Sequence, residues 1–387
     1  MLYVGIDVSA DKFHVAIYYP DSKSFKLLSF PQSRHGFDNF KSVLLALNDG
    51  LYIALEATGS YSHNLFSFLE SLDFNVLLLH PYAVKNILRA FSKSKTDSID
   101  AKNIALSVYL LDGNLKSSYT LPDNILSLRK LVRFRASLTK SMSNLQKQLR
   151  DVLRYNMPEI LNFFTMLSSN VLISLLSNYP SRKQILSHEK EVIKLLASFK
   201  NWSEGKARSL IHELKHSIAA SDPYDSEAII ISSIALQMKE IKEQIEKVNK
   251  QIDKILSDIP QNPISTIPGV GKVTQATIIS EVGDINRFET KQEFVSYIGL
   301  DPVIKQSGKS YHRCGISKKG KKMLRCIFYN LAIRVLRLVP KYRRKYNELV
   351  KRGKHPKVAI TAIARKLAEL VFILWKRNIP FDPCLAT

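Results

Sequence analysis

Four carboxylates in the first 100 residues of this 387-residue chain have the types and spacing that metal-assisted chemistry needs. Asp7 lies in GIDVS, Glu56 ends YIALE, and Asp97 and Asp100 lie in SKTDSIDA. Clustered carboxylates can hold two divalent ions, which stabilise the attacking and leaving oxygens of a phosphoryl transfer on DNA. Because oxygen-only ligands favour Mg²⁺ or Mn²⁺, we predict that all four acids are catalytic residues and ligands of such an ion.

The elements around these acids must direct them to one place. Val4, Ile6 and Val8 share one face of a predicted strand, so Asp7 points to the other face. Glu56 is likewise opposite Ile53 and Leu55. Residues three apart on a helix share a face, which applies to Asp97 and Asp100.

The first 111 residues have the pattern of an α/β domain with a mixed sheet. We predict strands over 2–8, 13–19, 27–30, 52–57 and 75–79, and helices over 37–47, 62–72 and 83–111. A turn at Ser9–Lys12 joins the first two strands. Plainer interpretations of the acids stay open, because a lone strand Asp is often a surface residue and Asp97 could simply cap the helix that follows.

Charge is unevenly distributed along the chain. Residues 1–100 contain 9 Lys and Arg against 10 Asp and Glu, whereas residues 301–387 contain 22 against 4, a net charge of +18. Such segregation indicates a surface for a polyanion, most often nucleic acid. The alternative is a disordered basic tail, but the segment has helical apolar periodicity.

The middle of the chain is predicted to be helical. Residues 124–154 have the pattern of a long basic helix, and helical patterns recur at 185–199 and 206–218. Over 229–259, apolar residues recur at alternating steps of three and four, which predicts a coiled-coil seam. The seam could pair within one chain, as part of a helical bundle, or with a second chain; we favour a second chain.

The C-terminal part combines turns and basic helices. The turn Pro268-Gly-Val-Gly271 resembles the hairpin of a helix-hairpin-helix module, although a plain structural turn explains it equally well. Residues 305–325 have the composition of a loop that faces DNA or RNA. We predict basic amphipathic helices over 323–350 and 356–377.

Cysteine usage and hydropathy indicate in which cellular compartment the chain is expected. Cys314, Cys326 and Cys384 have no metal-type spacing and fit free thiols in a reducing compartment. No run of about 18 apolar residues occurs, so we expect no membrane span. Asp7 interrupts the first apolar run, so we expect no signal peptide and a cytoplasmic, nucleoid-associated protein of prokaryotic type.

Taken in order, these motifs resemble one family. GIDVS, LEATGSY, KTDSIDA, IPGVGKVTQATIISEVGD, GLDP, SGKS and SKKGKKMLR resemble the DEDD transposases of bridge-RNA-guided insertion-sequence recombinases, which are related to site-specific DNA invertases. The resemblance covers residues 1–111 and about 264–377. It implies that the acidic tetrad is Asp7, Glu56, Asp97 and Asp100, in a RuvC-like domain, that is, one of ribonuclease-H type.

The resemblance also implies a serine nucleophile in the C-terminal part. The matching residue is Ser307, which follows Gly299-Leu-Asp-Pro302, and Ser310 is the fallback. A covalent serine–DNA link, an active site shared between domains, donor and target DNA, and a noncoding bridge RNA are implied in the same way. We expect a homo-oligomer, either a dimer or a tetramer.

The sequence therefore predicts three parts. Residues 1–118 form a RuvC-like catalytic domain, 119–262 a helical region with the coiled coil, and 263–387 a basic, helix-hairpin-helix-like transposase domain. The alternatives are a structure-selective nuclease of the Holliday-junction resolvase kind, which needs the tetrad but not Ser307, and a non-enzymatic coiled-coil protein that binds nucleic acid.

Overall fold

The fold was analysed in a computed structural model. It describes residues 1–47, 50–56, 61–74, 76–79, 96–110, 121–219, 226–307 and 310–383, with only the backbone for 304–307 and 310–314. The chain divides into two compact units, Met1–Thr120 and Leu121–Thr387. The predicted boundaries at 118 and 262 stay predictions.

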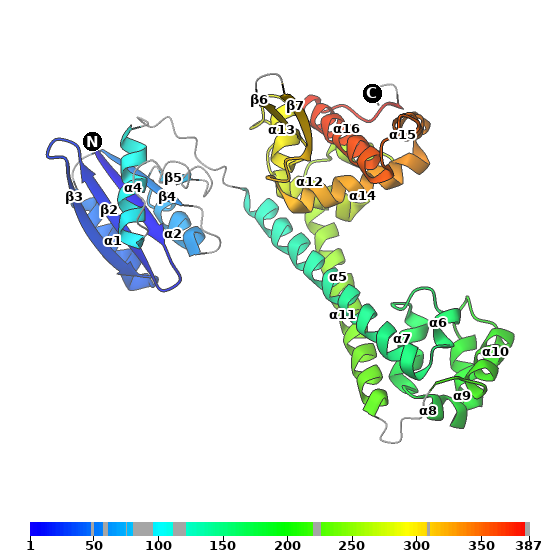
Figure 1. The fold of residues 1–387 in the computed structure, drawn as a ribbon. Helices are drawn as coiled ribbons and strands as arrows, with labels where there is room; N and C mark the ends of the chain where they lie inside the picture. Colours follow the sequence, from blue (N-terminus) through cyan, green and yellow to red (C-terminus); the bar gives the residue numbers. More distant parts are fainter. Residues whose placement is uncertain are drawn as a thin grey trace. The chain divides into compact units, whose positions relative to one another are not determined.

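The first unit is built on a five-stranded mixed sheet (Figure 1). Its strands are β1 (Leu2–Val8), β2 (Lys12–Tyr19), β3 (Ser24–Pro31), β4 (Leu51–Glu56) and β5 (Val76–Leu79), in the order β3-β2-β1-β4-β5. The hairpins β1–β2 and β2–β3 are antiparallel, and β4 pairs in parallel with both β1 and β5. The predicted mixed α/β sheet is confirmed.

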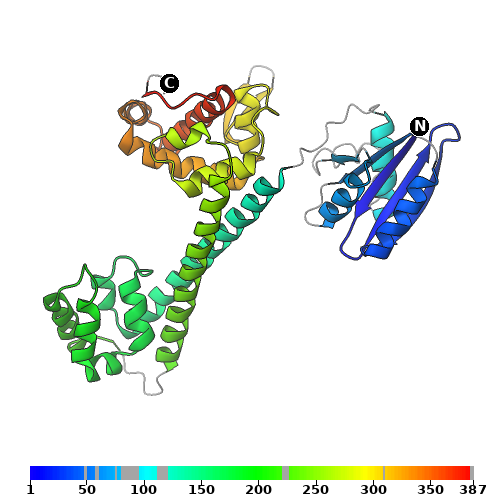
Figure 2. The same ribbon diagram turned by 180° about the vertical axis from the view of Figure 1, so that it is seen from behind.

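Helices cover both faces of this sheet (Figures 1 and 2). Helices α1 (Arg34–Leu45) and α2 (Tyr61–Glu70) pack on the face that carries Val4, Ile6 and Leu55. Helix α4 (Asp97–Leu110) packs on the opposite face. Residues 80–95, which include the start of the helix predicted over 83–111, lie outside the described residues.

The second unit is mostly helical, as expected. Two long helices, α5 (Asp123–Asn156) and α11 (Ser226–Ser257), lie side by side (Figure 2). Between them in sequence come α6 (Ile160–Phe163), α7 (Asn170–Asn178), α8 (Arg182–Ser187), α9 (Glu189–Ala197) and α10 (Glu204–Lys215). After α11 come η1 (Pro263–Thr266), α12 (Lys272–Val282), α13 (Lys291–Ile298), β6 (Pro302–Ser307), β7 (Ser310–Ile316), α14 (Lys322–Leu338), α15 (Pro340–Lys351) and α16 (Pro356–Arg377).

The apolar seam of α11 packs inside the chain. Its first half, including Ile231 and Met238, joins the core formed with α5, α7 and α10. Its second half, including Val248 and Ile252, joins Leu128 of α5 and apolar residues of α12. Our preference for a second chain in this seam is therefore corrected: α5 supplies the complementary apolar stripe, and the intramolecular alternative holds.

Two predicted helices are interrupted for local reasons. The helix expected over 323–350 ends at Leu338 and restarts at Pro340, whose ring removes a backbone donor and fixes the first turn of α15. The helix expected over 185–199 is divided at His188 into α8 and α9. Among the described residues, no helix combines the length and apolarity needed to cross a membrane.

The packing of α11 predicts unequal effects of two isoleucine truncations. Ile252 is fully buried, so Ile252→Ala should lower the free energy of unfolding by about 2–5 kcal/mol because it leaves a cavity. Ile229 lies on the same helix with 67% of its surface exposed, so Ile229→Ala should change stability by less than about 0.5 kcal/mol. Urea unfolding measures both. Equal effects would contradict the intramolecular seam.

Candidate active site

Asp7 and Glu56 lie on the same face of the sheet. In β1 the positions of Tyr3, Gly5 and Asp7 alternate with those whose side chains lie in the core under α1 and α2. Tyr3 and Ala54 belong to the core under α4, and Glu56 is two residues beyond Ala54 on β4. Because β1 and β4 are parallel and in register from Leu2 to Ile6, the two acids end adjacent strands on the α4 side.

A glycine allows α4 to lie close to this face. A Cβ on Gly5 would be 2.2 Å from the backbone oxygen of Ala101 and 2.3 Å from the backbone nitrogen of Ala105. Both distances are shorter than any real contact, so the backbones of β1 and α4 meet only because Gly5 has no side chain. Tyr3, towards the other end of β1, meets Tyr109 at 5.2 Å between ring centroids. Helix α4 therefore runs antiparallel to β1 and begins near Asp7.

The first turn of α4 carries the other two acids. Thr96 caps the helix: its Oγ1 accepts the backbone N–H of Ile99 at 3.3 Å. Asp97 is thus the first helical residue, and the capping role left open for it belongs to Thr96. Acidic side chains here are favoured by the unpaired N–H groups of the helix terminus.

His14 joins this group, although the sequence analysis did not select it. It pairs with Asp7 across the β1–β2 hairpin. Its Nε2 is buried, has no hydrogen-bond partner among the residues that the structure describes, and lies 3.6 Å from Oδ2 of Asp97, longer than a hydrogen bond. The available signal was the turn Ser9–Lys12, because the register it sets puts His14 beside Asp7.

Asp7 and Glu56 share a sheet face, and Asp97 and Asp100 lie in the first turn of the helix that covers it. Among the described residues, no three His, Cys, Asp or Glu side chains lie close enough together to hold a metal ion. The donor set nevertheless suits a hard divalent cation, since all four acids supply oxygen.

Ser307 is the last residue of strand β6, in a β-hairpin rather than a loop. Strands β6 and β7 are antiparallel, and Ser307 pairs with Ser310. The expectation of a loop over 305–325 is corrected: its first part is this hairpin, and its last part begins α14. Gly308, the partner of Ser307 in the Ser-Gly motif, lies outside the described residues.

Two motif glycines, Gly299 before the hairpin and Gly320 after it, allow close backbone contact. A Cβ on Gly320 would lie 2.1 Å from the backbone oxygen of Tyr297, and Gly299 has a positive φ of 80° at the end of α13. Arg325 donates from Nη1 to the backbone oxygens of Ile298 and Gly320 at 3.1 and 2.8 Å. Gly320 and Arg325 therefore fix the SKKGKKMLR motif against α13, and these contacts do not involve the side chains of its lysines.

The Pro-Gly-Val-Gly turn has a structural explanation as well. Gly269 has a φ of 88° and lies against α14, where Arg334 donates to its backbone oxygen at 2.9 Å. A short 3-10 helix precedes the turn and α12 follows it. The helix-hairpin-helix resemblance thus holds only for the helix after the turn.

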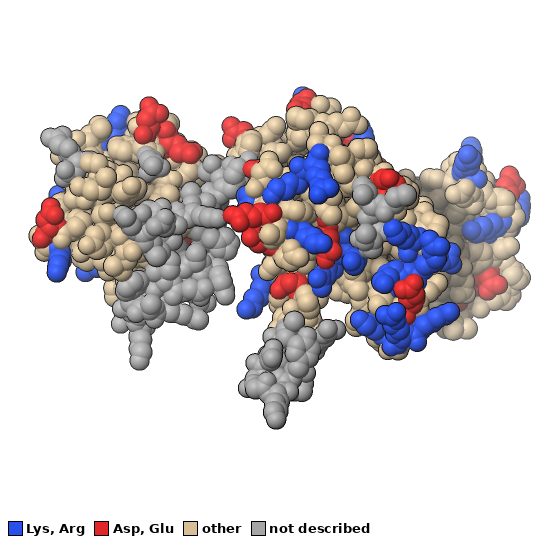
Figure 3. Space-filling view, turned by 90° about the horizontal axis from the view of Figure 1, so that it is seen from above, with Lys and Arg blue, Asp and Glu red and all other residues tan. Residues whose placement is uncertain are grey.

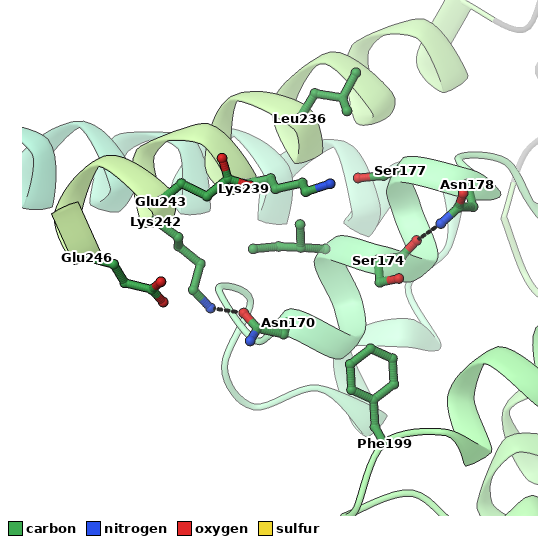
Figure 4. A pocket seen from close by; sticks show the side chains of 11 residues that line it. Asn170, Ser174, Ser177, Asn178, Phe199, Leu236, Lys239, Lys242, Glu243 and Glu246 are labelled. Carbon is green, nitrogen blue, oxygen red and sulfur yellow. Dashed lines mark hydrogen bonds between the residues drawn. The ribbon is translucent and has the colours of Figure 1, made fainter.

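A pocket of about 460 Å³ lies between α7 and α11, and Phe199, which follows α9, also lines it (Figure 4). Its lysines serve the fold: Lys242 donates to the backbone oxygen of Ser168 at 2.8 Å and to the side chain of Asn170. Lys239 extends towards Ser177. The pocket belongs to the second unit, whereas the four acids belong to the first.

Exposed basic side chains are abundant in the second unit. Lys and Arg gather on the face of this unit that Figure 3 displays. Exposed basic residues run from α15 through the turn after it to the start of α16: Lys341, Arg343, Arg344, Lys345, Lys351, Arg352, Lys354 and Lys357. These residues belong to ordered helices and turns, so the basic segment is not a disordered tail.

Comparison with known proteins finds two family matches. Residues 4–158 match the DEDD transposases of IS110 type, a model described as "Transposase". Residues 261–347 match the model described as "Transposase IS116/IS110/IS902 family". The chain belongs to the IS110/IS116 transposase family.

Individual relatives agree with this family. The chain is 23% identical over 386 residues to the "Insertion element IS110 uncharacterized 43.6 kDa protein" of Streptomyces coelicolor, a match that covers 96% of this chain and 93% of the relative. It is 34% identical over 121 residues to the "Pilin gene-inverting protein" of Moraxella bovis, covering 31% of this chain and only 38% of the relative. It is 33% identical over 120 residues to the "Transposase for insertion sequence element IS1111A" of Coxiella burnetii, covering 30% and 32%. The chain thus spans less than two fifths of the length of the pilin gene-inverting protein that it matches.

The contact at Gly5 predicts a position-specific effect of adding one methyl group. Gly5→Ala should displace α4 and lower the free energy of unfolding by about 1–3 kcal/mol, because the new Cβ overlaps the α4 backbone. Gly205→Ala is the matched control: its Cβ would meet nothing closer than 3.9 Å, and alanine favours the helix by up to about 1 kcal/mol. Thermal unfolding compares the two. If Gly5→Ala is as stable as wild type, β1 and α4 are not in contact as described.

Proposed function

We propose that this transposase is the recombinase of a mobile insertion sequence and catalyses DNA strand cleavage and transfer. The observation that carries the proposal is the shared sheet face of Asp7 and Glu56, which α4 covers with Asp97 and Asp100 in its first turn. Family membership supports it. The mixed sheet, with helices on both faces, supports the RuvC-like part of the proposal.

In this proposal Asp7, Glu56, Asp97 and Asp100 hold Mg²⁺ or Mn²⁺. A bound divalent ion polarises the scissile phosphate and stabilises the departing oxygen. The acids come from the ends of β1 and β4 and from the helix N-terminus, so the backbone orients them before the ion binds. Asp97 and His14 are already neighbours at 3.6 Å.

Ser307 is the proposed nucleophile. Its hydroxyl oxygen would form a phosphoester with DNA, and the sugar hydroxyl on the other side of the phosphate would leave. Serine is a weak nucleophile at neutral pH and needs help, so Ser307 and the acidic residues must act on the same phosphodiester. Ser310, its pairing partner across the hairpin, is the natural control.

The proposed partners are donor and target DNA, and the resemblance to bridge-RNA-guided recombinases adds a noncoding RNA. The basic surface of the second unit supports binding of nucleic acid backbones, because Lys and Arg neutralise phosphates and release counterions. A homo-oligomer, a dimer or a tetramer, remains part of the proposal, although the α11 seam is already occupied by α5. A cytoplasmic, nucleoid-associated location completes it.

Neutralising one acid should separate catalysis from binding. Asp7→Asn removes a charged ligand without changing the basic surface, so DNA cleavage should fall by about 100-fold or more, whereas affinity for DNA changes little. Asp38→Asn, on α1 at the opposite face of the sheet, should leave both unchanged. A recombination assay on donor and target plasmids, with the element's flanking region supplied, measures cleavage. Normal cleavage by Asp7→Asn would exclude this acid from the site.

Removing the nucleophile should abolish a covalent intermediate. Ser307→Ala should lose both recombination and a protein–DNA adduct that depends on Mg²⁺, whereas Ser310→Ala should keep them. Denaturing electrophoresis with labelled DNA detects the adduct. If Ser307→Ala still cuts DNA at the normal rate, water is the nucleophile and the resolvase-type nuclease is the better description.

A further inference from the structure

Four basic side chains surround or adjoin the ring of Tyr297, and we call Arg129, Arg133, Arg287 and Lys321 the Tyr297 cluster. They come from three separate segments: α5, the link between α12 and α13, and the residue before α14. Residues almost 200 positions apart in the sequence thus supply one concentration of positive charge.

Two members of the cluster are fixed by α12. Arg133 binds the buried carboxylate of Glu281 through two hydrogen bonds, of 2.6 and 3.0 Å. Arg129 donates to the backbone oxygens of Ser280 and Glu281 at 2.7 and 3.2 Å. Burial would raise the pKa of Glu281, but the hydrogen bonds from Arg133 and the charges of Arg133, Arg129 and Lys321 outweigh it and lower that pKa. The negative charge of Glu281 is therefore already paired with Arg133 inside the fold.

The other two members lie on the aromatic ring. The guanidinium of Arg287 is 4.4 Å from the ring centre of Tyr297 and 4.6 Å from that of Phe288. The ammonium of Lys321 is 5.9 Å from the ring centre of Tyr297. Within the described part of the chain, neither Arg287 nor Lys321 has an ion pair with a carboxylate.

The cluster has more positive charge than its protein surroundings neutralise. Four cations face one carboxylate, an excess of three positive charges. Burial lowers the pKa of Lys321; the charge of Glu281 opposes this, and the charges of Arg129, Arg133 and Arg287 add to the lowering. Like charges at short range are unfavourable, so an anion among them would relieve the repulsion.

The framework that holds these cations is rigid. The hydroxyl of Tyr297 donates to the backbone oxygen of Glu281 at 2.9 Å, and the backbone N–H of Lys321 donates to the backbone oxygen of Tyr297 at 3.0 Å. The contact of Gly320 with the same oxygen leaves no room for a side chain. Because these hydrogen bonds already hold the segments that carry the cations, little conformational entropy is lost when a ligand binds.

We infer that the Tyr297 cluster is a phosphate-binding site for the sugar–phosphate backbone of a nucleic acid, with Arg287 and Lys321 making the contacts. This inference rests on the proposed function for the identity of the ligand, and it assigns an anchoring point apart from the four acids and Ser307. Arginine and lysine suit phosphate oxygens, and such contacts position a nucleic acid without reading its sequence.

The test compares two double variants of the full chain with equal loss of charge. Arg287→Gln/Lys321→Gln removes the proposed contacts. Lys190→Gln/Lys194→Gln is the control on α9, where both lysines are exposed and two glutamates lie in the first turn. Affinities for a DNA duplex and for an RNA hairpin are measured between about 50 and 200 mM salt. The cluster variant should lower the magnitude of the logarithmic salt slope by about 1–2, and the control should not.

Each nucleic acid gives its own answer. If the salt slope falls for only the DNA duplex or only the RNA hairpin, that polymer is the ligand. If it falls for both, the cluster contacts the sugar–phosphate backbone that they share. Equal slopes for wild type and the cluster variant, or an equal fall in the control, would overturn the inference. Lys321→Arg, which keeps the charge, should restore the wild-type slope, and thermal unfolding of each variant checks that the fold is kept.

Inorganic phosphate separates failure of the site from failure of the proposed function. At equal ionic strength, phosphate in place of chloride should raise the unfolding midpoint of wild type more than that of the cluster variant, because a ligand stabilises the state that binds it. If wild type binds no nucleic acid but shows this difference, the site stands and the proposed function fails. If nucleic acid binds normally and the difference is absent, the site fails and the proposed function stands.

Discussion

The arrangement of the first unit depends on one backbone contact, between β1 and α4 at Gly5. A hydrogen in place of a side chain lets the two backbones meet, so α4 lies flat on the sheet and its first turn ends over the carboxyl end of β1. The parallel pairing of β1 and β4 then brings Glu56 beside Asp7, and the antiparallel hairpin brings His14 there as well. Four different elements, β1, β2, β4 and α4, thus direct polar side chains to one edge of the sheet.

The second unit is held together by long-range contacts of a different kind. Helices α5 and α11 bury each other's apolar stripes, and the pair Arg133–Glu281 fixes α5 to the end of α12. A buried carboxylate without its arginine would be strongly unfavourable, so this pair specifies the register between segments about 150 residues apart. The same register brings Arg129 beside residues of the α12–α13 link and of the segment before α14. A structural requirement therefore also produces the concentration of charge around Tyr297.

The sequence predicted those features that depend on local periodicity. Alternation along β1 and β4 correctly assigned the faces of Asp7 and Glu56, and apolar periodicity located α5, α11 and α16. Prediction from the sequence failed for features that depend on a contact with a distant segment of the chain. The partner of the α11 seam could not be identified, because an apolar stripe does not record which helix covers it. The role of His14 required the hairpin register, and the Tyr297 cluster required the tertiary packing of three segments. Proline and glycine effects were local but were underestimated, as at Pro340 and in the hairpin before α14.

We propose that the sheet face under α4 gathers carboxylates for a divalent ion, and binding of Mn²⁺, followed by electron paramagnetic resonance, decides whether it does. We expect the wild-type chain to bind Mn²⁺, and we expect Asp7→Asn and Glu56→Gln each to weaken that binding by about tenfold or more. Loss of a residue that only hydrogen-bonds a metal ligand already lowers metal affinity by about that factor, and loss of a ligand itself should lower it at least as much. Glu70→Gln, at the end of α2 in the same unit, should bind as wild type does. Binding that is unchanged in both site variants, or lowered equally in Glu70→Gln, would contradict the account.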